Sequence, residues 1–308
     1  MTDSKNNMIL LEIYDIAKVV YLYTNIDKFG PSMYAKCATK EDLEKELTKL
    51  RKFLEHIILK KGSINVKYDL NKDGRIFGAP YTIQCISGVV RNFLLEDTDV
   101  VDVDIVNLIN CVMLSICKKH DIKCKTLTKY YNERQTIIDK YYDGDKDACK
   151  NFINASFFKN YTWIKPNNVF EKGIAKDIKA IHDYVFNHDD FVKYRENATK
   201  TCKRDNIDNV KGRTLNYVYT DIECDILKAA MHYYLTVTKK CVRTAMFDGF
   251  IADKSDMFKL SKLNKAMRNH INSDITFIYK PITQNIIPKM TAEDYLNTDE
   301  CLCRIYSE

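Results

Sequence analysis

Two short apolar runs of this chain carry aspartates in strand-like settings. Residues 100–105 read VVDVDI and contain Asp102 and Asp104, which would point to the same face of a strand. About 145 residues later, residues 246–251 read MFDGFI and put Asp248 on a two-residue turn between apolar stretches. Two aspartates brought together from distant strands can hold a pair of Mg²⁺ ions for phosphoryl displacement. A lone Asp-Gly between apolar runs is also an ordinary hairpin turn.

Length and composition favour a compact protein. The chain has 308 residues, of which 45% are hydrophobic and 29% are charged, so it can bury a full core and form two subdomains. The sequence contains no apolar run of about 18 residues and no signal peptide after its polar start, MTDSKNN. These features predict cytoplasmic or nuclear residence, with neither secretion nor a membrane partner.

The cysteines and histidines do not indicate a metal or disulfide framework. The eleven cysteines are an odd number, and they form no Cys-x-x-Cys ladder with neighbouring histidines. Cys301 and Cys303 come closest to a metal-binding pair, but no second pair accompanies them. The six histidines are equally dispersed. We therefore expect reduced thiols, and the sequence pattern does not indicate a zinc site.

The hydrophobic periodicity predicts a mostly helical chain with a few strands. Residues 8–24 form an apolar segment, Thr39 caps an amphipathic helix over 40–59, and Asp73-Gly74 turns into a short strand. Further strands are expected at residues 100–106, 242–247, 250–252 and 275–279. Further helices are expected at residues 81–95, 107–119, 127–141, 146–158, 175–186, 191–201 and 215–238.

Basic residues gather in two stretches of a chain whose net charge is +6. One stretch spans residues 193–213. The other places a lysine or arginine at every third position from Lys259 to Arg268, along an expected helix. Either stretch could follow a phosphate backbone, and either could be an ordinary solvated face.

The helix expected over residues 146–158 has a distinctive spacing. Lys146, Lys150, Asn154 and Phe158 are four residues apart, so they drift slowly around the helix and share one side. Two lysines can hold the phosphates of a nucleoside triphosphate, while an aromatic ring stacks on its sugar or base. Solvated lysines with Phe158 in the core would give the same pattern.

The order of these motifs resembles that of family A DNA polymerases and single-subunit RNA polymerases. Asp102 on a strand, followed five residues later by Asn107, is similar to their motif A. The helix over 146–158 is similar to motif B, and residues 247–249 are similar to motif C, the hairpin that carries a second metal-binding aspartate. In family A enzymes a glutamate usually stands at the position matched by Asn107, so the resemblance implies weaker discrimination against ribonucleotides.

Residues 73–282 resemble more closely the compact polymerase branch found in large DNA viruses and transposons. The pattern of that branch contains a Gly-Arg step, a helix ending in Arg, then Asp-x-Asp-x-x-Asn and Asn-x-Arg. These elements correspond here to Gly74-Arg75, Arg91, residues 102–107 and residues 132–134, with Lys211-Gly212 and Lys280-Pro281 also in the expected places.

The resemblance implies an α+β fold with a right-hand polymerase palm, helical fingers and a helical N-terminal region. The implied parts are an N-terminal support over 1–72, a first palm part over 73–140, fingers over 141–209, a second palm part over 210–285 and a C-terminal tail over 286–308. The implied function is a template-directed polymerase, a nucleotidyltransferase of a viral or mobile-element replication system that uses two Mg²⁺ ions.

The implied partners are a DNA or RNA template-primer, nucleoside triphosphates and a replicative helicase, with a viral replication site in the cytoplasm as one location. The implied roles fall into three groups. The metal ligands are Asp102 and Asp248, with Asp104 as the alternate first ligand. Residues near the triphosphate are Lys146, Lys150, Asn154, Phe158 and Asn107. Contacts to template or primer phosphates are Arg75 and Arg91.

Three departures from the family pattern keep an alternative open. Residues 108–110 read LIN where the branch usually has a residue followed by His-Pro, Lys146 stands where Arg is common, and Phe247 stands where the larger superfamily often has His. The alternative is a catalytically inactive, polymerase-like scaffold that binds nucleic acid and serves as the partner of a replicative helicase.

Overall fold

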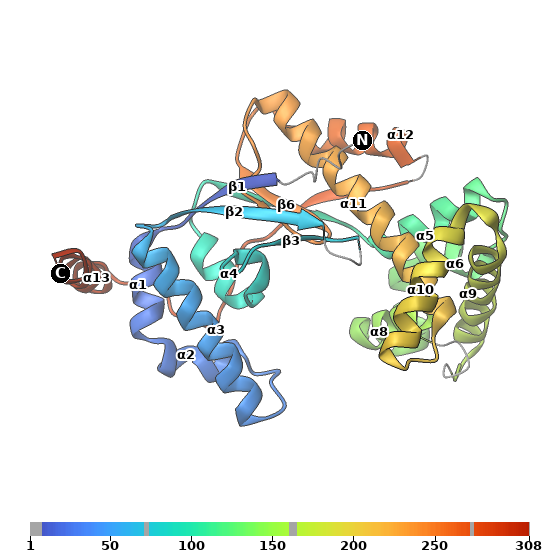
Figure 1. Cartoon of the computed structure of the whole chain (residues 1–308), viewed down its shortest axis with the longest axis horizontal. Helices are drawn as coiled ribbons and strands as arrows, with labels where there is room; N and C mark the ends of the chain where they lie inside the picture. The colour runs from blue at the N-terminus through green and yellow to red at the C-terminus, as the bar shows by residue number, and fades with distance from the viewer. Residues whose placement is uncertain (1–7, 71–73, 160–164, 272–273, 308) are drawn as a thin grey trace.

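The chain combines helices with two separate antiparallel sheets (Figure 1). The structure, a computed structural model, describes residues 8–70, 74–159, 165–271 and 274–307. The expected mixture of helix and sheet is confirmed. Asp73 of the expected Asp73-Gly74 turn lies outside the described residues, whereas Gly74 has a φ of 87° and precedes a short strand as expected.

A three-stranded sheet and three helices form the N-terminal part. The strands are β1 (Met8–Ile13), β2 (Ser63–Leu70) and β3 (Ile76–Gly78), in the order β1-β2-β3. The helices are α1 (Ile16–Thr24), α2 (Ile26–Met33) and α3 (Lys40–Leu59). The N-terminal region, expected to be helical, thus contains three helices and also the strands β1 and β2. In β1 only Leu10 and Glu12 are buried, and the apolar residues at exposed positions hide this alternation from a reading of the sequence.

A buried carboxylate ties this sheet to the following loop. Glu12 accepts hydrogen bonds from the hydroxyls of Tyr14, Tyr68 (2.7 Å) and Thr82 (2.6 Å), and from the backbone N–H of Ile83 (3.1 Å). The network precedes the 3₁₀ turn η1 (Ile83–Cys85) and helix α4 (Gly88–Leu95). The helix expected over 81–95 is therefore shorter, because Ser87 caps it with a hydrogen bond from the Val90 N–H (3.3 Å).

The second sheet brings together strands from distant parts of the chain. Its order is β5-β6-β4-β7, and all neighbours are antiparallel. The strands are β4 (Val100–Ile105), β5 (Thr244–Ala245), β6 (Gly249–Asp253) and β7 (Phe277–Lys280). The strands expected around Asp102 and Asp248 are therefore confirmed as neighbours in one sheet.

The remaining helices form a lobe on one side of this sheet and two peripheral pieces (Figure 1). The lobe contains α5 (Leu108–Lys119), α6 (Lys125–Asn132), α7 (Arg134–Tyr142), α8 (Lys146–Phe158), α9 (Val169–Asn187), the 3₁₀ turn η3 (Asp189–Phe191) and α10 (Val192–Asp205). The single helix expected over 127–141 is thus two helices that meet at Glu133. The peripheral pieces are α12 (Leu260–Ile271) and α13 (Ala292–Ser307), so the expected C-terminal tail is largely helical.

Helix α11 (Val210–Thr238) links the helical lobe to the second sheet (Figure 1). It packs against α8, α9 and α10 along one part and against β6 and α12 along another. Asn209 caps the start of this helix by accepting a hydrogen bond from the Gly212 N–H (3.2 Å). The helix therefore begins at Val210, five residues before the start at residue 215 that the sequence periodicity indicates. Buried residues run from Gly212 to Thr238, so this helix is a central element of the core.

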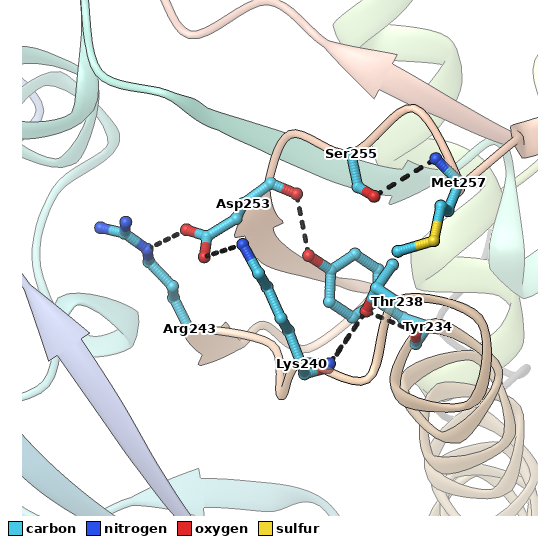
Figure 2. Close-up of polar contacts among 7 residues, drawn as sticks. All are labelled: Tyr234, Thr238, Lys240, Arg243, Asp253, Ser255 and Met257. Atoms are coloured by element: carbon cyan, nitrogen blue, oxygen red, sulfur yellow. Dashed lines mark hydrogen bonds and ion pairs between the residues drawn. The ribbon is translucent and has the colours of Figure 1, made fainter.

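Polar contacts fix the end of α11 to the β5–β6 hairpin, as Figure 2 shows. The hydroxyl of Tyr234 donates to the backbone carbonyl of Asp253 (2.8 Å), and the Asp253 carboxylate pairs with Arg243 and with Lys240 (4.0 Å). Thr238 closes the helix by donating to the Tyr234 carbonyl (2.8 Å). These contacts hold both strands that flank the turn bearing Asp248. No helix in the described part of the chain is long and apolar enough to cross a membrane.

Candidate functional site

Strand register brings Asp104 and Asp248 to one cavity. Asp104 faces Gly249 across the β4–β6 ladder, and the backbone N–H of Ile105 donates to the Asp248 carbonyl (3.1 Å). Asp248 therefore lies in the turn beside the end of β4. Both carboxylates line a cavity of about 470 Å³. The structure therefore brings this pair of distant aspartates to one cavity, and their binding of metal stays a prediction.

Asp102 lies on the same strand but lines a neighbouring cavity. Its side chain is largely buried, with 7% of the residue exposed, and it shares the second cavity with Lys280, which also lines the first. Burial raises the pKa of Asp102 to about 6, although the positive charges of Arg91 and Lys280 oppose this rise. Within the described residues, Asp102, Asp104 and Asp248 do not form a set whose oxygens all lie within 4.8 Å of one another.

Lys280 pairs with the carboxylate of Asp104, and both residues line the cavity. Its Nζ lies 3.5 Å from Oδ2 of Asp104, a contact made possible because β7 pairs with β4 on the side away from β6. Burial raises the pKa of Asp104, and the nearby charge of Asp248 raises it further, whereas Lys280 lowers it. Asp104 is therefore balanced between a negative and a positive neighbour.

Two further cations line the cavity from the helical lobe. Lys150 comes from α8, and Arg134 comes from the start of α7, where its Nε donates to the Tyr130 hydroxyl (3.2 Å). Among the residues that the structure describes, Lys150 has no acidic partner within ion-pair distance. Both residues line the same cavity as Asp104 and Asp248, so the cavity offers positive charge to an anionic ligand as well as carboxylates.

A polar wall joins the N-terminal part to α11. Nε of Arg75 pairs with Oε2 of buried Glu223 (2.8 Å), and the Tyr219 hydroxyl donates to Oε1 of the same carboxylate (2.5 Å). The Arg75 guanidinium lies over the ring of Phe247, 5.7 Å from its centroid. Burial raises the pKa of Glu223, and the charge of Arg75 opposes that rise. All four side chains line the cavity next to Asp248.

The face expected on α8 is only partly directed at the cavity. Lys150 and Asn154 line it, whereas Lys146 is exposed outside it and Phe158 packs against Tyr219, with ring centroids 5.5 Å apart. The reason is geometric: a four-residue step turns about 40° beyond a full helical turn, so three steps separate the ends by about 120°. Of the four side chains, the structure thus brings Lys150 and Asn154 to the cavity and leaves Lys146 and Phe158 outside its lining.

Two other predicted residues occupy distinct positions. Asn107 lines the cavity with a left-handed backbone, φ 52° and ψ 41°, and its side chain makes no capping hydrogen bond to α5. Arg91 lies outside the cavity lining. Its Nε is buried without a hydrogen-bond partner among the described residues, and its charge acts on Asp102. From the sequence, Arg91 is expected to contact template or primer phosphates. In the structure its charge acts on the carboxylate of Asp102, and a contact with nucleic acid stays a prediction.

Several lining residues were not given a role from the sequence. They are Tyr130, Arg134, Tyr219, Glu223 and Lys280. Arg134 and Lys280 did stand in the motif pattern, as part of Asn-x-Arg and Lys-Pro, so the signal existed for those two. The basic stretches over 193–213 and 259–268 do not contribute to the lining of this cavity.

Comparison with solved structures shows similarity to a polymerase domain. The chain is similar to the POL domain of Pol1 from M. smegmatis in complex with DNA primer-template and dNTP, with a TM-score of 0.49 and 10% sequence identity. The similarity covers 88% of this chain and 66% of that chain. No protein-family model matches the sequence, and no curated protein matches it. The function proposed below rests on the residues of the cavity.

Proposed function

We propose that this protein is a nucleotidyltransferase that extends a nucleic-acid strand on a template. One observation carries the proposal: the carboxylates of Asp104 and Asp248 line the same cavity as Lys150 and Arg134. Two carboxylates and two cations on one cavity suit a reaction in which a triphosphate is held and attacked in line. On this proposal, the sheet with β4 and β6 serves as the palm and the helical lobe serves as the fingers.

The donor set fits a hard divalent cation. Asp104 and Asp248 offer carboxylate oxygens, which are the ligands that Mg²⁺ prefers, and the cavity has room for substrate phosphates to complete the coordination. When bound, two Mg²⁺ ions would polarise the attacked phosphate and stabilise the attacking and leaving oxygens. Asp102, one step back along β4, is proposed as an auxiliary acid that shares Lys280 with Asp104.

We propose that the two cations from the helical lobe orient the triphosphate. Lys150 and Arg134 would neutralise phosphate charge, and Asn154, one turn after Lys150, would offer an amide to the sugar or base. Arg75 is paired with Glu223, so we propose that it also shapes the wall beside Asp248. The contacts of Arg75 and Arg91 to template or primer remain predictions.

The biological setting is proposed from the family resemblance. It implies a viral or mobile-element replication system, with DNA or RNA template-primer and nucleoside triphosphates as partners. A replicative helicase as a partner follows only from the same resemblance.

The test is primer extension by the purified protein with Mg²⁺, using ribonucleotides and deoxyribonucleotides separately. We expect incorporation that Asp104→Asn and Asp248→Asn each reduce by about 1000-fold, since the amide keeps the shape but loses the charge that binds metal. Asp299→Asn, an exposed acid on α13, is the matched control and should extend normally. We expect a smaller loss, about tenfold, for Asp102→Asn.

Two results would contradict this proposal. Equal extension by wild type and Asp248→Asn would remove the carboxylate pair from the chemistry. Binding of template-primer by the wild type without any incorporation under all nucleotide and metal conditions would instead favour the inactive scaffold.

A further inference from the structure

A cluster of two histidines and an aspartate lies far from the cavity, at the end of α5. His120 follows the last turn of α5, whereas His188 and Asp190 belong to the junction between α9 and α10. One nitrogen of each ring and one carboxylate oxygen of Asp190 lie within 4.8 Å of one another. We propose that these three side chains bind a divalent transition-metal ion, for which Zn²⁺ is the best match.

The chemistry of the donors selects the ion. Imidazole nitrogen favours Zn²⁺ and its first-row neighbours over Mg²⁺, and two histidines with one carboxylate form a common zinc ligand set that leaves a fourth position for water. Donor atoms of a tetrahedral zinc site lie about 3.3 Å apart, as follows from Zn–N distances near 2.0–2.1 Å. The three donor atoms here lie within 4.8 Å of one another, so side-chain rotations would have to bring them closer to form the site. The partial exposure of His188 and Asp190 leaves their side chains free to rotate.

A neighbouring hydroxyl orients the first ligand. The hydroxyl of Tyr184 lies 3.0 Å from Nδ1 of His120, which leaves Nε2 of that ring to face a metal. Metal-binding histidines usually have the second nitrogen engaged in this way, since the bond fixes the direction of the ring. Ring stacking adds to the effect: the Tyr184 and His188 centroids are 4.8 Å apart, and Phe191 meets the edge of His120 at 5.6 Å.

The other two ligands are held in one tight turn. The backbone N–H of Asp190 donates to Nδ1 of His188 (3.3 Å), and Oδ2 of Asp190 lies 3.9 Å from the same nitrogen. Coordination of a metal through Nδ1 would replace this hydrogen bond, because one lone pair cannot serve both. Phe191 is buried and anchors the turn to the lobe. The site therefore joins the end of α5, which follows β4, to the α9–α10 junction, and a bound ion would clamp these elements together.

The test is a titration of the full-length protein, stripped with chelator and kept reduced, with Zn²⁺ by calorimetry and with Co²⁺ by visible absorption. We expect one Zn²⁺ per chain, a higher Tm with Zn²⁺ and a Co²⁺ spectrum without the thiolate charge-transfer band that cysteine ligands would give. His188→Ala and Asp190→Asn should each weaken binding by roughly tenfold or more. The matched control is His232→Ala, an exposed histidine on α11, which should bind as the wild type does.

Three results would overturn the inference: no binding by the wild type, unchanged binding by both variants, or a Co²⁺ spectrum with thiolate ligands. Asp190→Asn keeps the shape of an exposed side chain, so a folding failure of His188→Ala would not prevent a decision. The three ligands are not among the proposed catalytic residues. A negative result in the zinc titration would therefore leave the proposed primer extension untouched.

Discussion

Asp104 lies directly opposite Gly249 in the β4–β6 ladder. A Cβ at position 249 would lie 2.0 Å from the backbone oxygen of Val103, which is closer than any atom pair tolerates. Because Gly249 has no Cβ, β4 and β6 can approach closely at this point. This approach places the turn that contains Asp248 beside Asp104. The carboxylate pair depends on a residue that has no side chain of its own.

Gly249→Ala should lower the free energy of unfolding by about 3 kcal/mol, because the methyl group must push β6 away from β4. Primer extension should fall with it as the two carboxylates separate. Thermal unfolding and extension at a temperature where the variant stays folded check both effects. Gly88→Ala is the control: its Cβ would meet only Arg91 at 3.7 Å, so stability should change by less than about 1 kcal/mol. Equal stability of the two variants would contradict the close approach.

Lys150→Ala and Lys146→Ala form a matched pair on α8. Lys150 lines the cavity and Lys146, one turn earlier, lies outside it. We expect Lys150→Ala to raise the KM for nucleotide by roughly tenfold, since a phosphate contact is lost, and Lys146→Ala to change it by less than about twofold. Steady-state kinetics with saturating primer-template separate them. Equal effects of the two changes would indicate a diffuse basic surface instead of a defined triphosphate site.

Asn107→Glu should shift nucleotide preference toward deoxyribonucleotides, because the longer side chain would crowd a ribose 2′-hydroxyl in the cavity. Asn107 stands at the N-cap position of α5, but its side chain makes no capping hydrogen bond to that helix. A left-handed backbone disfavours Glu by about 1 kcal/mol, whereas Asn107→Gly should fold at least as stably as the wild type. The readout is the ratio of kcat/KM for matched nucleotides. An unchanged ratio in Asn107→Glu would place the sugar elsewhere.

His182 should make stability depend on pH. Its Nε2 donates to the Phe157 carbonyl (2.7 Å), Nδ1 has no partner among the described residues, and burial lowers the pKa below its ordinary value of 6.5. The unfolded chain therefore binds the proton more readily, so this contribution is present above pH 6.5 and is lost as pH falls toward the folded-state pKa. The loss by pH 5.5 is up to about 1.4 kcal/mol.

His182→Gln isolates that effect. Gln keeps an N–H donor for the Phe157 carbonyl and cannot titrate, so the variant should lose less stability than the wild type between pH 7.5 and 5.5. Chemical denaturation at both pH values measures the difference. Parallel losses in the two proteins would assign the pH dependence to other groups.

Local sequence patterns predicted the helices and strands whose periodicity is strong. The bounds of α3 and α8 agree with expectation to the residue, and β4 ends one residue earlier than expected. The predictions were less accurate where a capping residue sets the start of a helix, or where a strand has apolar residues on its exposed face as well as its buried face. Asn209 begins α11 before its apolar pattern starts, and β1 exposes Ile9, Leu11 and Ile13 on the side away from the core.

The sequence by itself determined that Asp102 and Asp104 stand on a strand and Asp248 on a turn, and that lysines recur on one helix. It could not decide which acid shares a cavity with Asp248, because Asp102 and Asp104 point to the same face and local periodicity treats them alike. The register of β4 against β6 and β7 made that choice, by setting Asp104 opposite Gly249 and within reach of Lys280. Register depends on contacts between residues about 150 apart, which no local pattern records.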